Sequence, residues 1–380
     1  MLPLGPESGT HGFLLLFRPE PREVPDIQGA MALPLPVRSR ILAIETSDMA
    51  LMAENAAVGK PAANPEWLSR RIDLSASPER TGAAHLVASG ASARTEPAGA
   101  ARHAEELERG NILFLPRSPF PLSEDDKSFL LEQKQADAGY HKNIAYRPAE
   151  DRLTGTGKSP APETARLKRI LRAYSDWATQ FLGELIPEYA GNWTKDFASY
   201  RAIEEEGRGA RLTARNDLAH VDAFPTRPTH GDRILRLFTN LNPVKSRVWV
   251  TSETFEGLAG RFARQVGIPS APRPGAQSFE HLARALGIRQ WTRSPYDAFM
   301  LRFHDFLKQN RDFQQNCAKQ RWEFPPGSCW ICYTDMVSHA VLSGQFALEQ
   351  TFLISRHAMA LPEKSPIRIL ERICGHPLSG

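Results

Sequence analysis

The chain has 380 residues, of which 47 are basic and 43 acidic, so its formal net charge is only +4. This charge is too small to indicate a nucleic-acid partner, and we expect none. The longest apolar run near the N-terminus covers residues 13–17, far short of the roughly 18–20 residues that a membrane helix needs. Its flanking residues do not fit a secretory signal, so we expect a cytoplasmic protein.

The first 103 residues are poor in the side chains that build a core. Only 3 of the 33 aromatic residues lie there, together with 18 alanines and 11 prolines. A segment of this composition does not bury enough apolar area to offset the entropy lost on ordering. We therefore expect residues 1–103 to form a mostly disordered extension with room for short helices, whose removal leaves the function intact.

A folded domain is expected at 104–362, with a tail at 363–380. Residues 111–116 predict a short strand. Ser123 precedes three acidic residues, which is typical of the capped start of a helix. A longer helix follows, because apolar residues recur at helical spacing over 167–185, before a proline.

The second half of the domain favours strands, with a helical segment inserted at about 252–312. One inserted helix begins at Ser294, which is followed by proline at the first helical position. We expect a mainly β fold with flanking helices, a double-stranded β-helix of the jelly-roll type, and not the regular βαβ alternation of a Rossmann sheet. The predicted strands are 197–201, 218–224, 234–241, 247–250, 328–335 and 346–354, with a link through His339 between the last two.

Two of the four cysteines, Cys329 and Cys332, form a CxxC motif. A structural zinc site would need a second ligand pair, whereas Cys317 and Cys374 stand alone. Three residues apart on a strand, the CxxC side chains would point to opposite faces. We predict that they are buried strand residues.

His220 and Asp222 place an imidazole and a carboxylate two residues apart in a predicted strand, so both project from the same face. A third ligand from a later strand would complete the two-histidine, one-carboxylate set of non-haem Fe(II) oxygenases. Such an iron keeps open positions for a 2-oxo acid and for O2. The alternative is an ordinary hydrogen-bonded histidine.

The same pattern occurs a second time, at His230 and Asp232. This copy follows two prolines and contains a glycine, so we interpret it as a turn that leads into the strand at 234–241. The first copy lies inside an alternating segment and is therefore the favoured ligand pair.

The third ligand must come from a histidine after the helical insertion. His339 lies between two predicted strands, where the fold would bring it back over the first pair. His357 and His376 lie beyond the last predicted strand. His281 and His304 lie on predicted helices, where a solvated face is expected. We therefore favour His339.

An iron enzyme that uses 2-oxoglutarate also needs a cation for the far carboxylate of this cosubstrate, and the fork of an arginine suits it best. Many such enzymes place this arginine on the last strand, about a dozen positions after the distal histidine, but residues 349–351 here read Glu-Gln-Thr. Arg236 lies between two leucines on another strand, where an unpaired charge is costly. Arg236, with Asn240 further along that strand, is our candidate for 2-oxoglutarate binding, and a structural salt bridge is the alternative for the arginine.

Five segments together resemble the Kdo hydroxylases, Fe(II)- and 2-oxoglutarate-dependent dioxygenases of Gram-negative bacteria. The resemblance runs from about residue 110 to residue 354. It implies a double-stranded β-helix that hydroxylates C3 of the 3-deoxy-octulosonic acid (Kdo) on lipid A, giving the sugar acid Ko. It assigns the catalytic iron-ligand roles to His220, Asp222 and His339. The segments are 139–148, 218–225, 234–243, 334–340 and 346–352.

The implied substrate carries sugar carboxylates and lipid A phosphates, so cationic side chains should surround the mouth of the site. Because the substrate is a membrane lipid, we expect peripheral contact with the cytoplasmic leaflet of the inner membrane. Three acidic residues at 204–206 partly offset the available cations. The candidates are Lys142, Arg201, Arg208, Arg211 and Arg215.

Two alternatives to this function stay open. The first keeps the chemistry but changes the substrate to a protein side chain or a small metabolite. The second is a non-catalytic jelly roll that binds sugars or anions, with His220 and Asp222 as ordinary polar residues. Iron content and succinate formation separate the second from the first, and lipid analysis tests the substrate.

Overall fold

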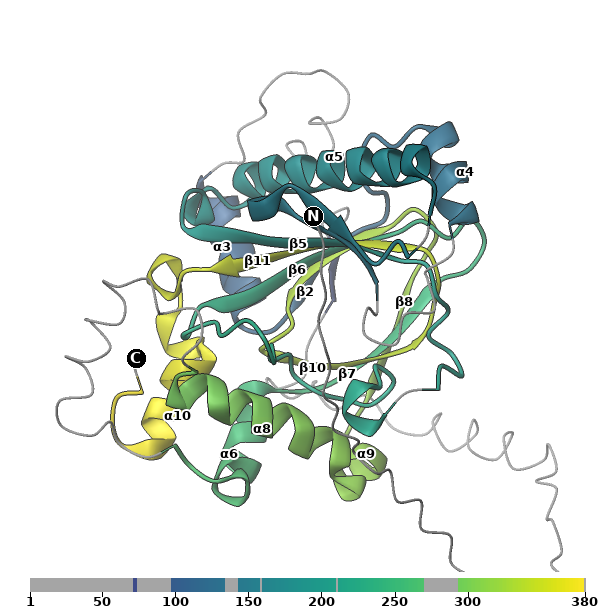
Figure 1. Ribbon diagram of the computed structural model, residues 1–380. Helices are drawn as coiled ribbons and strands as arrows, with labels where there is room; N and C mark the ends of the chain where they lie inside the picture. Colours follow the sequence, from purple (N-terminus) through teal and green to yellow (C-terminus); the bar gives the residue numbers. More distant parts are fainter. Residues whose placement is uncertain are drawn as a thin grey trace, which may run out of the picture. The chain divides into compact units, whose positions relative to one another are not determined.

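Two β-sheets form the framework of the protein (Figure 1). The computed structural model describes residues 71–73, 97–133, 143–157, 159–209, 211–269 and 293–378. The strands in these residues are β1 (Arg71–Asp73), β2 (Ile112–Leu115), β3 (Ile144–Arg147), β4 (Arg152–Thr154), β5 (Trp193–Arg201), β6 (Arg233–Asn240), β7 (Arg247–Thr254), β8 (Gln320–Phe324), β9 (Cys329–Tyr333), β10 (Val337–Ser343) and β11 (Ala347–Ile354).

The larger sheet has eight strands in the order β1-β2-β9-β6-β11-β5-β3-β4, and the smaller sheet has three in the order β10-β7-β8. All pairs are antiparallel except β1 with β2. The hydrogen bonds between the described strands do not join the two sheets into a closed barrel. The fold is thus mainly β with helices on the outside, as predicted at the level of fold class.

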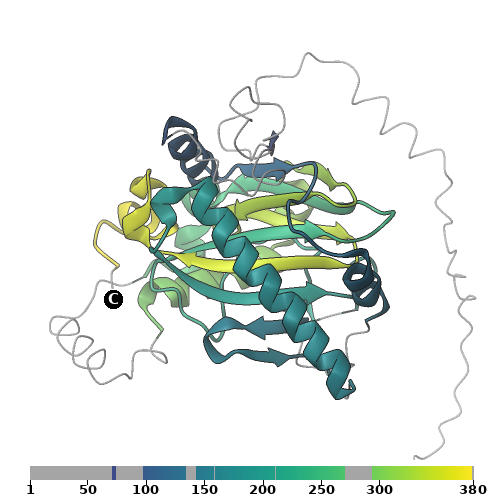
Figure 2. The ribbon, with the colours of Figure 1, turned by 90° about the horizontal axis from the view of Figure 1, so that it is seen from above.

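Within the residues that the structure describes, seven α-helices accompany the sheets. Helix α5 runs across the outer face of the large sheet (Figure 2), and α6 and α8 lie on the side of the small sheet (Figure 1). The helices are α3 (Pro97–Glu108), α4 (Glu124–Glu132), α5 (Ala161–Leu185), α6 (Phe255–Val266), α8 (Pro295–Gln309), α9 (Arg311–Asn316) and α10 (Pro366–Cys374).

The predicted helix starts are confirmed by their caps. The Ser123 hydroxyl accepts a hydrogen bond from the main-chain N–H of Asp126, and Ser294 does the same for Asp297. Helix α5 ends at Leu185, just before Pro187, because proline cannot donate the next helical hydrogen bond.

The strands of the large sheet separate two cores. Leu235 and Leu237 of β6 belong to the main core, which also contains the buried stripe of α5. Phe238 points the other way, against Trp249 of the small sheet. A fully buried side chain of this kind stabilises the fold by roughly 1.5–3 kcal/mol. Alternation along β6 therefore turns Arg236, between the two leucines, toward the space between the sheets.

The CxxC prediction is confirmed. Cys329 and Cys332 are buried in β9 and lie in different cores, so they occupy opposite faces of the sheet. Cys317 and Cys374 are partly exposed.

The predicted strand at 218–224 is wrong. Only His220 pairs, as an isolated bridge to His339. The side chain of Gln314 bonds both the N–H and the C=O of Ala219, so these groups are not available for a strand ladder. The predicted link through His339 is also wrong, since this residue lies inside β10.

Regular structure is found beyond both ends of the expected domain. Helix α3 begins at Pro97 and β1 covers Arg71–Asp73, within the extension that we expect to be mostly disordered. The rest of residues 1–103 lies outside the described residues. In the predicted tail, α10 buries Ile367, Ile369 and Leu370 in the main core.

Candidate metal centre

His220, Asp222 and His339 converge on one point. Their ligand atoms all lie within 4.8 Å of one another. Atoms about 2.0–2.2 Å from a shared ion lie at most about 4.4 Å apart, so a small closure of the side chains suffices for an ion to bind. The three residues predicted as ligands are therefore those that the fold brings together.

Main-chain hydrogen bonds set this convergence. The N–H of His220 donates to the C=O of His339 at 3.1 Å, and the N–H of His339 donates back at 2.9 Å. The N–H of Asp222 donates to the C=O of Thr334. Directly opposed residues of an antiparallel pair project to the same face, so the two imidazoles lie side by side, with ring centroids 4.8 Å apart.

Each histidine ring is held in the tautomer that a metal requires. Nδ1 of His220 lies 2.7 Å from the C=O of Leu218, and Nδ1 of His339 lies 2.8 Å from the C=O of Val337. A carbonyl oxygen only accepts hydrogen bonds, so the proton must be on Nδ1 and Nε2 presents its lone pair. Such a carbonyl partner commonly orients metal-binding histidines.

The charge states also suit a divalent cation. Burial lowers the pKa of His220 well below its usual value, and burial likewise lowers the pKa of His339, so both rings are neutral near pH 7. Burial by itself raises the pKa of Asp222, but the Arg236 guanidinium outweighs it and holds that pKa well below its usual range. Two neutral imidazoles and one carboxylate are thus ready to bind.

One buried atom at the site supports this fit. Oδ2 of Asp222 is buried, and although it lies in an ion pair with Arg236 it accepts no hydrogen bond from the described residues. A buried carboxylate oxygen without a hydrogen bond is costly, and a metal ion would relieve that cost.

The second His-x-Asp copy forms a turn, as predicted. His230 and the following glycine have positive φ angles of 53° and 91°, and the His230 N–H donates to the Asp297 carboxylate. Of the other histidines considered, His357 lies in a short 3-10 helix after β11, and His376 follows α10. His281 lies outside the described residues.

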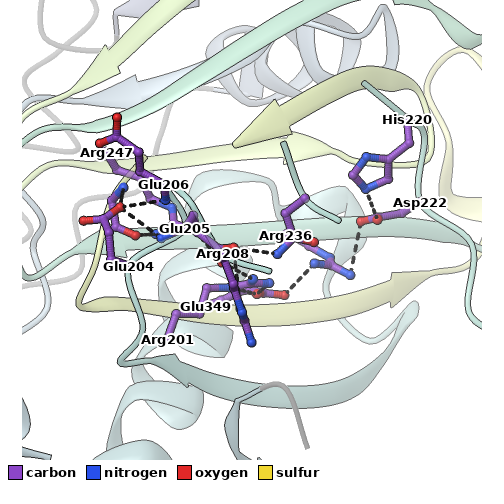
Figure 3. A network of polar contacts seen from close by, with 12 residues as sticks. Arg201, Glu204, Glu205, Glu206, Arg208, His220, Asp222, Arg236, Arg247 and Glu349 are labelled. Atoms are coloured by element: carbon purple, nitrogen blue, oxygen red, sulfur yellow. Dashed lines mark hydrogen bonds and ion pairs between the residues drawn. The ribbon is translucent and has the colours of Figure 1, made fainter. Parts of the chain in front are cut away.

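Arg236 lies between two carboxylates (Figure 3). Its Nη2 is 3.1 Å from Oδ2 of Asp222, and its Nη1 is 3.0 Å from Oε1 of Glu349. Both the predicted closeness to the site and the alternative of a salt bridge are therefore found. Whether this arginine also binds 2-oxoglutarate stays a prediction.

Asn240 has a different environment from the one expected. Its amide nitrogen donates to the C=O groups of Lys245 and Phe324, and its oxygen accepts from the N–H of Asn242. These three bonds hold the loop after β6. They leave the amide committed to the backbone, which argues against a role in cosubstrate binding.

The predicted substrate-binding cations are mostly engaged with acids. Arg201 pairs with the buried Glu349, Arg208 with Glu205 and Arg215 with Asp217. Arg211 is exposed, and Lys142 lies outside the described residues.

Several side chains at the site were not predicted. Trp249 stacks on His339, with centroids 5.2 Å apart and planes 19° apart. His304, expected on a solvated helix face, is largely buried and meets the ring of His220 edge-on at 5.0 Å. Burial lowers the pKa of His304. The helical register of α8 could have suggested this burial, because His304 lies four residues after Met300 and three before Leu307, which are both buried.

A row of stacked cations and rings leads away from Asp222. The Arg236 guanidinium lies 5.6 Å from the centre of the Phe224 ring. The Arg227 guanidinium lies between two rings, 4.2 Å from the centre of Phe224 and 4.0 Å from that of Phe197. Arg147 of β3 lies 4.7 Å from Phe197. We call Arg147, Phe197, Arg227 and Phe224 the arginine–phenylalanine row.

Two histidines and one carboxylate with this geometry, on a mainly β fold, are typical of non-haem Fe(II) oxygenases. Comparison of the chain with known proteins narrows this class to one family. The model of the 3-deoxy-D-manno-oct-2-ulosonic acid (Kdo) hydroxylase family matches residues 91–377. None of the curated proteins matches the chain significantly.

Solved structures agree with the family match. The chain is similar to the Kdo hydroxylase KdoO, a non-haem Fe(II) α-ketoglutarate-dependent dioxygenase, in its apo form, with 35% identity, a TM-score of 0.65, and coverage of 76% of this chain and 94% of that chain. Coverage is the same for the complex with α-ketoglutarate and Fe(III), at 35% identity and a TM-score of 0.64, and for the cobalt(II) complex, at 36% and 0.66. The chain belongs to the Kdo hydroxylase family.

Proposed function

We propose that this chain is an Fe(II)- and 2-oxoglutarate-dependent dioxygenase that hydroxylates C3 of Kdo on lipid A to give Ko. The observation that carries the proposal is the convergence of His220, Asp222 and His339 within 4.8 Å in a member of the Kdo hydroxylase family. Within the proposal, the two sheets correspond to the double-stranded β-helix of this enzyme class.

The proposed metal ligands are Nε2 of His220, Nε2 of His339 and a carboxylate oxygen of Asp222. When bound, iron and 2-oxoglutarate supply the oxidising power that places one oxygen atom of O2 on a substrate carbon. The protein holds the ligand geometry through the His220–His339 main-chain pair and covers one ring with Trp249. These contacts keep water away from one side of the centre.

Arg236 is the proposed partner of the far carboxylate of 2-oxoglutarate. It is in contact with the carboxylate ligand Asp222, so it lies beside the position where the cosubstrate would bind. A planar guanidinium binds a carboxylate through two parallel hydrogen bonds.

The arginine–phenylalanine row is the proposed binding surface for the anionic sugar. It begins beside Arg236 and ends at β3, next to the edge strand β4 of the large sheet, and the side chains of Arg227 and Arg147 are about a third exposed. Arg227 also pairs with Asp196 and Arg147 with Glu150, so an incoming carboxylate or phosphate would share these arginines with the two acids. This surface replaces Arg201, whose side chain is less exposed.

Contact with the membrane would be peripheral under this proposal. Among the described residues, no helix is both long and apolar enough to cross a bilayer. A lipid-linked sugar would then reach the site from the surface of the cytoplasmic leaflet, with its phosphates near basic side chains.

Mass spectrometry of Kdo-carrying lipid A tests the proposal directly. The lipid is isolated from a host that expresses the chain or its His220→Ala variant. We expect one added oxygen atom on Kdo with the wild-type chain and none with the variant. If no oxygen is added in the presence of iron and 2-oxoglutarate, Kdo on lipid A is not the substrate. If succinate forms with another acceptor, the dioxygenase reaction stands and only the substrate assignment fails.

A further inference from the structure

Glu349 occupies a buried position between two arginines on the inner face of the large sheet (Figure 3). It lies on β11, opposite Phe238 of β6, and its side chain is 3% exposed. Its Oε2 accepts hydrogen bonds from Nε of Arg201, at 2.8 Å, and from Nη2 of the same side chain. Its Oε1 accepts from the Thr351 hydroxyl at 3.0 Å and lies 3.0 Å from Nη1 of Arg236.

These contacts fix the carboxylate in place. Arg201 binds it through a fork, and Thr351 adds a bond on the other oxygen, so neither oxygen can rotate without losing a partner. Burial by itself raises the pKa of Glu349, but Arg201 and Arg236 outweigh it and hold that pKa below its usual value. The group is therefore a fixed negative charge beside Arg236.

The consequence concerns Asp222. One end of the Arg236 guanidinium faces Glu349 and the other faces Asp222 at 3.1 Å, yet Oδ2 of Asp222 accepts no hydrogen bond from any described residue. The arginine is thus shared and is not aligned on the metal ligand. If Glu349 did not hold one end, the planar fork would be free to pair fully with Asp222.

Full pairing would oppose metal binding for two reasons. A carboxylate that already accepts two charge-assisted hydrogen bonds is a weaker ligand, and an uncompensated positive charge near the centre repels a divalent cation. Both effects would lower the affinity for the metal. Glu349 therefore favours metal binding through its charge and through its hold on Arg236.

We propose that Glu349, anchored by Arg201, is a positioning residue that divides Arg236 between two carboxylates and so keeps Asp222 free to bind the metal. This inference rests on the proposed function, because it takes Asp222 as a ligand. It gives Arg201 an anchoring role in place of the predicted contact with substrate.

The test measures Co(II) binding to the full-length chain by isothermal titration calorimetry, together with thermal unfolding. We expect Glu349→Gln to raise the Kd for Co(II) at least about tenfold, within the range usual for residues that orient a metal ligand. Glu205→Gln is the matched control. It removes the same charge from a buried glutamate that also contacts Arg201, and Kd should stay within about twofold, which is under 0.5 kcal/mol.

A double variant separates positioning from a structural role. Glu349→Gln combined with Arg236→Met should restore most of the Co(II) affinity, because no arginine is left to pair with Asp222. Thr351→Val, which removes one hydrogen bond to Glu349, should weaken binding by a smaller factor. If Glu349→Gln does not fold, Co(II) binding to Thr351→Val still tests the proposal.

The outcomes distinguish this inference from the proposed function. Wild-type affinity in folded Glu349→Gln would overturn the positioning role while leaving the metal centre intact. An affinity loss that persists in the double variant would overturn it as well. Absence of Co(II) binding by the wild-type chain would instead remove the metal centre itself.

Discussion

The main-chain groups of His220 and His339 hydrogen-bond to each other in both directions, at 3.1 and 2.9 Å. This reciprocal pair joins a segment without regular structure to β10 and sets two imidazoles side by side. The ligand geometry thus depends on this pair, on the main-chain bond from Asp222 to Thr334, and on Gln314, which holds the neighbouring Ala219.

Substitution of the ligand histidine should abolish metal binding without unfolding the protein. We expect His220→Ala to lose detectable Co(II) binding, because two remaining ligands hold an ion weakly, while its thermal midpoint changes by a few degrees at most. His230→Ala, in the turn copy of the same motif, is the control and should bind Co(II) as the wild type does. Loss of binding in the control alone would reverse the choice of ligands.

Substitution of Arg236 and of Arg227 should change different Michaelis constants, that for the cosubstrate and that for the substrate. Arg236→Met should raise the KM for 2-oxoglutarate about tenfold or more, since a charge-assisted hydrogen bond to a carboxylate contributes roughly 1.5–3 kcal/mol. Arg227→Met should act mainly on the KM for Kdo-lipid A, because it lies further along the arginine–phenylalanine row. The reverse pattern would exchange the two roles.

Most of the fold could be predicted because local patterns determine it. The caps at Ser123 and Ser294 and the stripe of α5 depend on neighbouring residues, and all three are found in the structure. The failures involve long-range contacts. Gln314, nearly a hundred residues away in the sequence, takes the backbone groups of Ala219 and prevents the predicted strand.

At the candidate site too, local patterns could be predicted and contacts between distant elements could not. The spacing of His220 and Asp222 indicated a metal site, and His339 followed from its position after the insertion. The roles of Glu349 and His304 could not be read from the sequence, since each depends on a partner from another element. The glutamate at 349 did carry a signal, because it stands where an arginine was expected.

The buried cysteines should resist thiol reagents in the native protein. Burial raises the pKa of Cys329 to about 12 and raises that of Cys332 further, so almost no thiolate forms at pH 8. We expect Ellman's reagent to label only the two partly exposed thiols, Cys317 and Cys374, until denaturant is added. A Cys374→Ser variant should lose one of these native equivalents, and rapid labelling of all four thiols would show that β9 is accessible.

Helix α10 should be required for stability although it lies in the predicted tail. Leu370 is fully buried in the main core, so Leu370→Ala should lower the free energy of unfolding by about 2–5 kcal/mol. Ile373→Ala, on the same helix but only partly buried, should cost clearly less. Urea denaturation measures both. Equal, small losses would mean that α10 is not part of the cooperative unit.

The contact between α4 and α5 should make stability depend on pH in the acid range. A hydrogen bond from Arg169 is the main cause that lowers the pKa of Asp126; burial opposes it, and Arg166 adds to the lowering. A carboxylate whose pKa is lower in the folded state stabilises the protein above its unfolded pKa, near 3.9. That stabilisation is lost as the pH falls through the lower, folded value.

Asp126→Asn should therefore cost about 0.5–1 kcal/mol at pH 7, the upper range for a partly exposed ion pair, and progressively less as the pH falls below about 4. Glu124→Gln, on the same first turn but largely exposed, is the matched control and should cost less at pH 7. Chemical denaturation at pH 7 and below about pH 4 measures the free energy of unfolding of each variant and of the wild type. A penalty for Asp126→Asn that is the same in acid and at neutrality would mean that the carboxylate acts through its shape and hydrogen bonds, because charge pairing with Arg169 and Arg166 must disappear once the carboxylate is protonated.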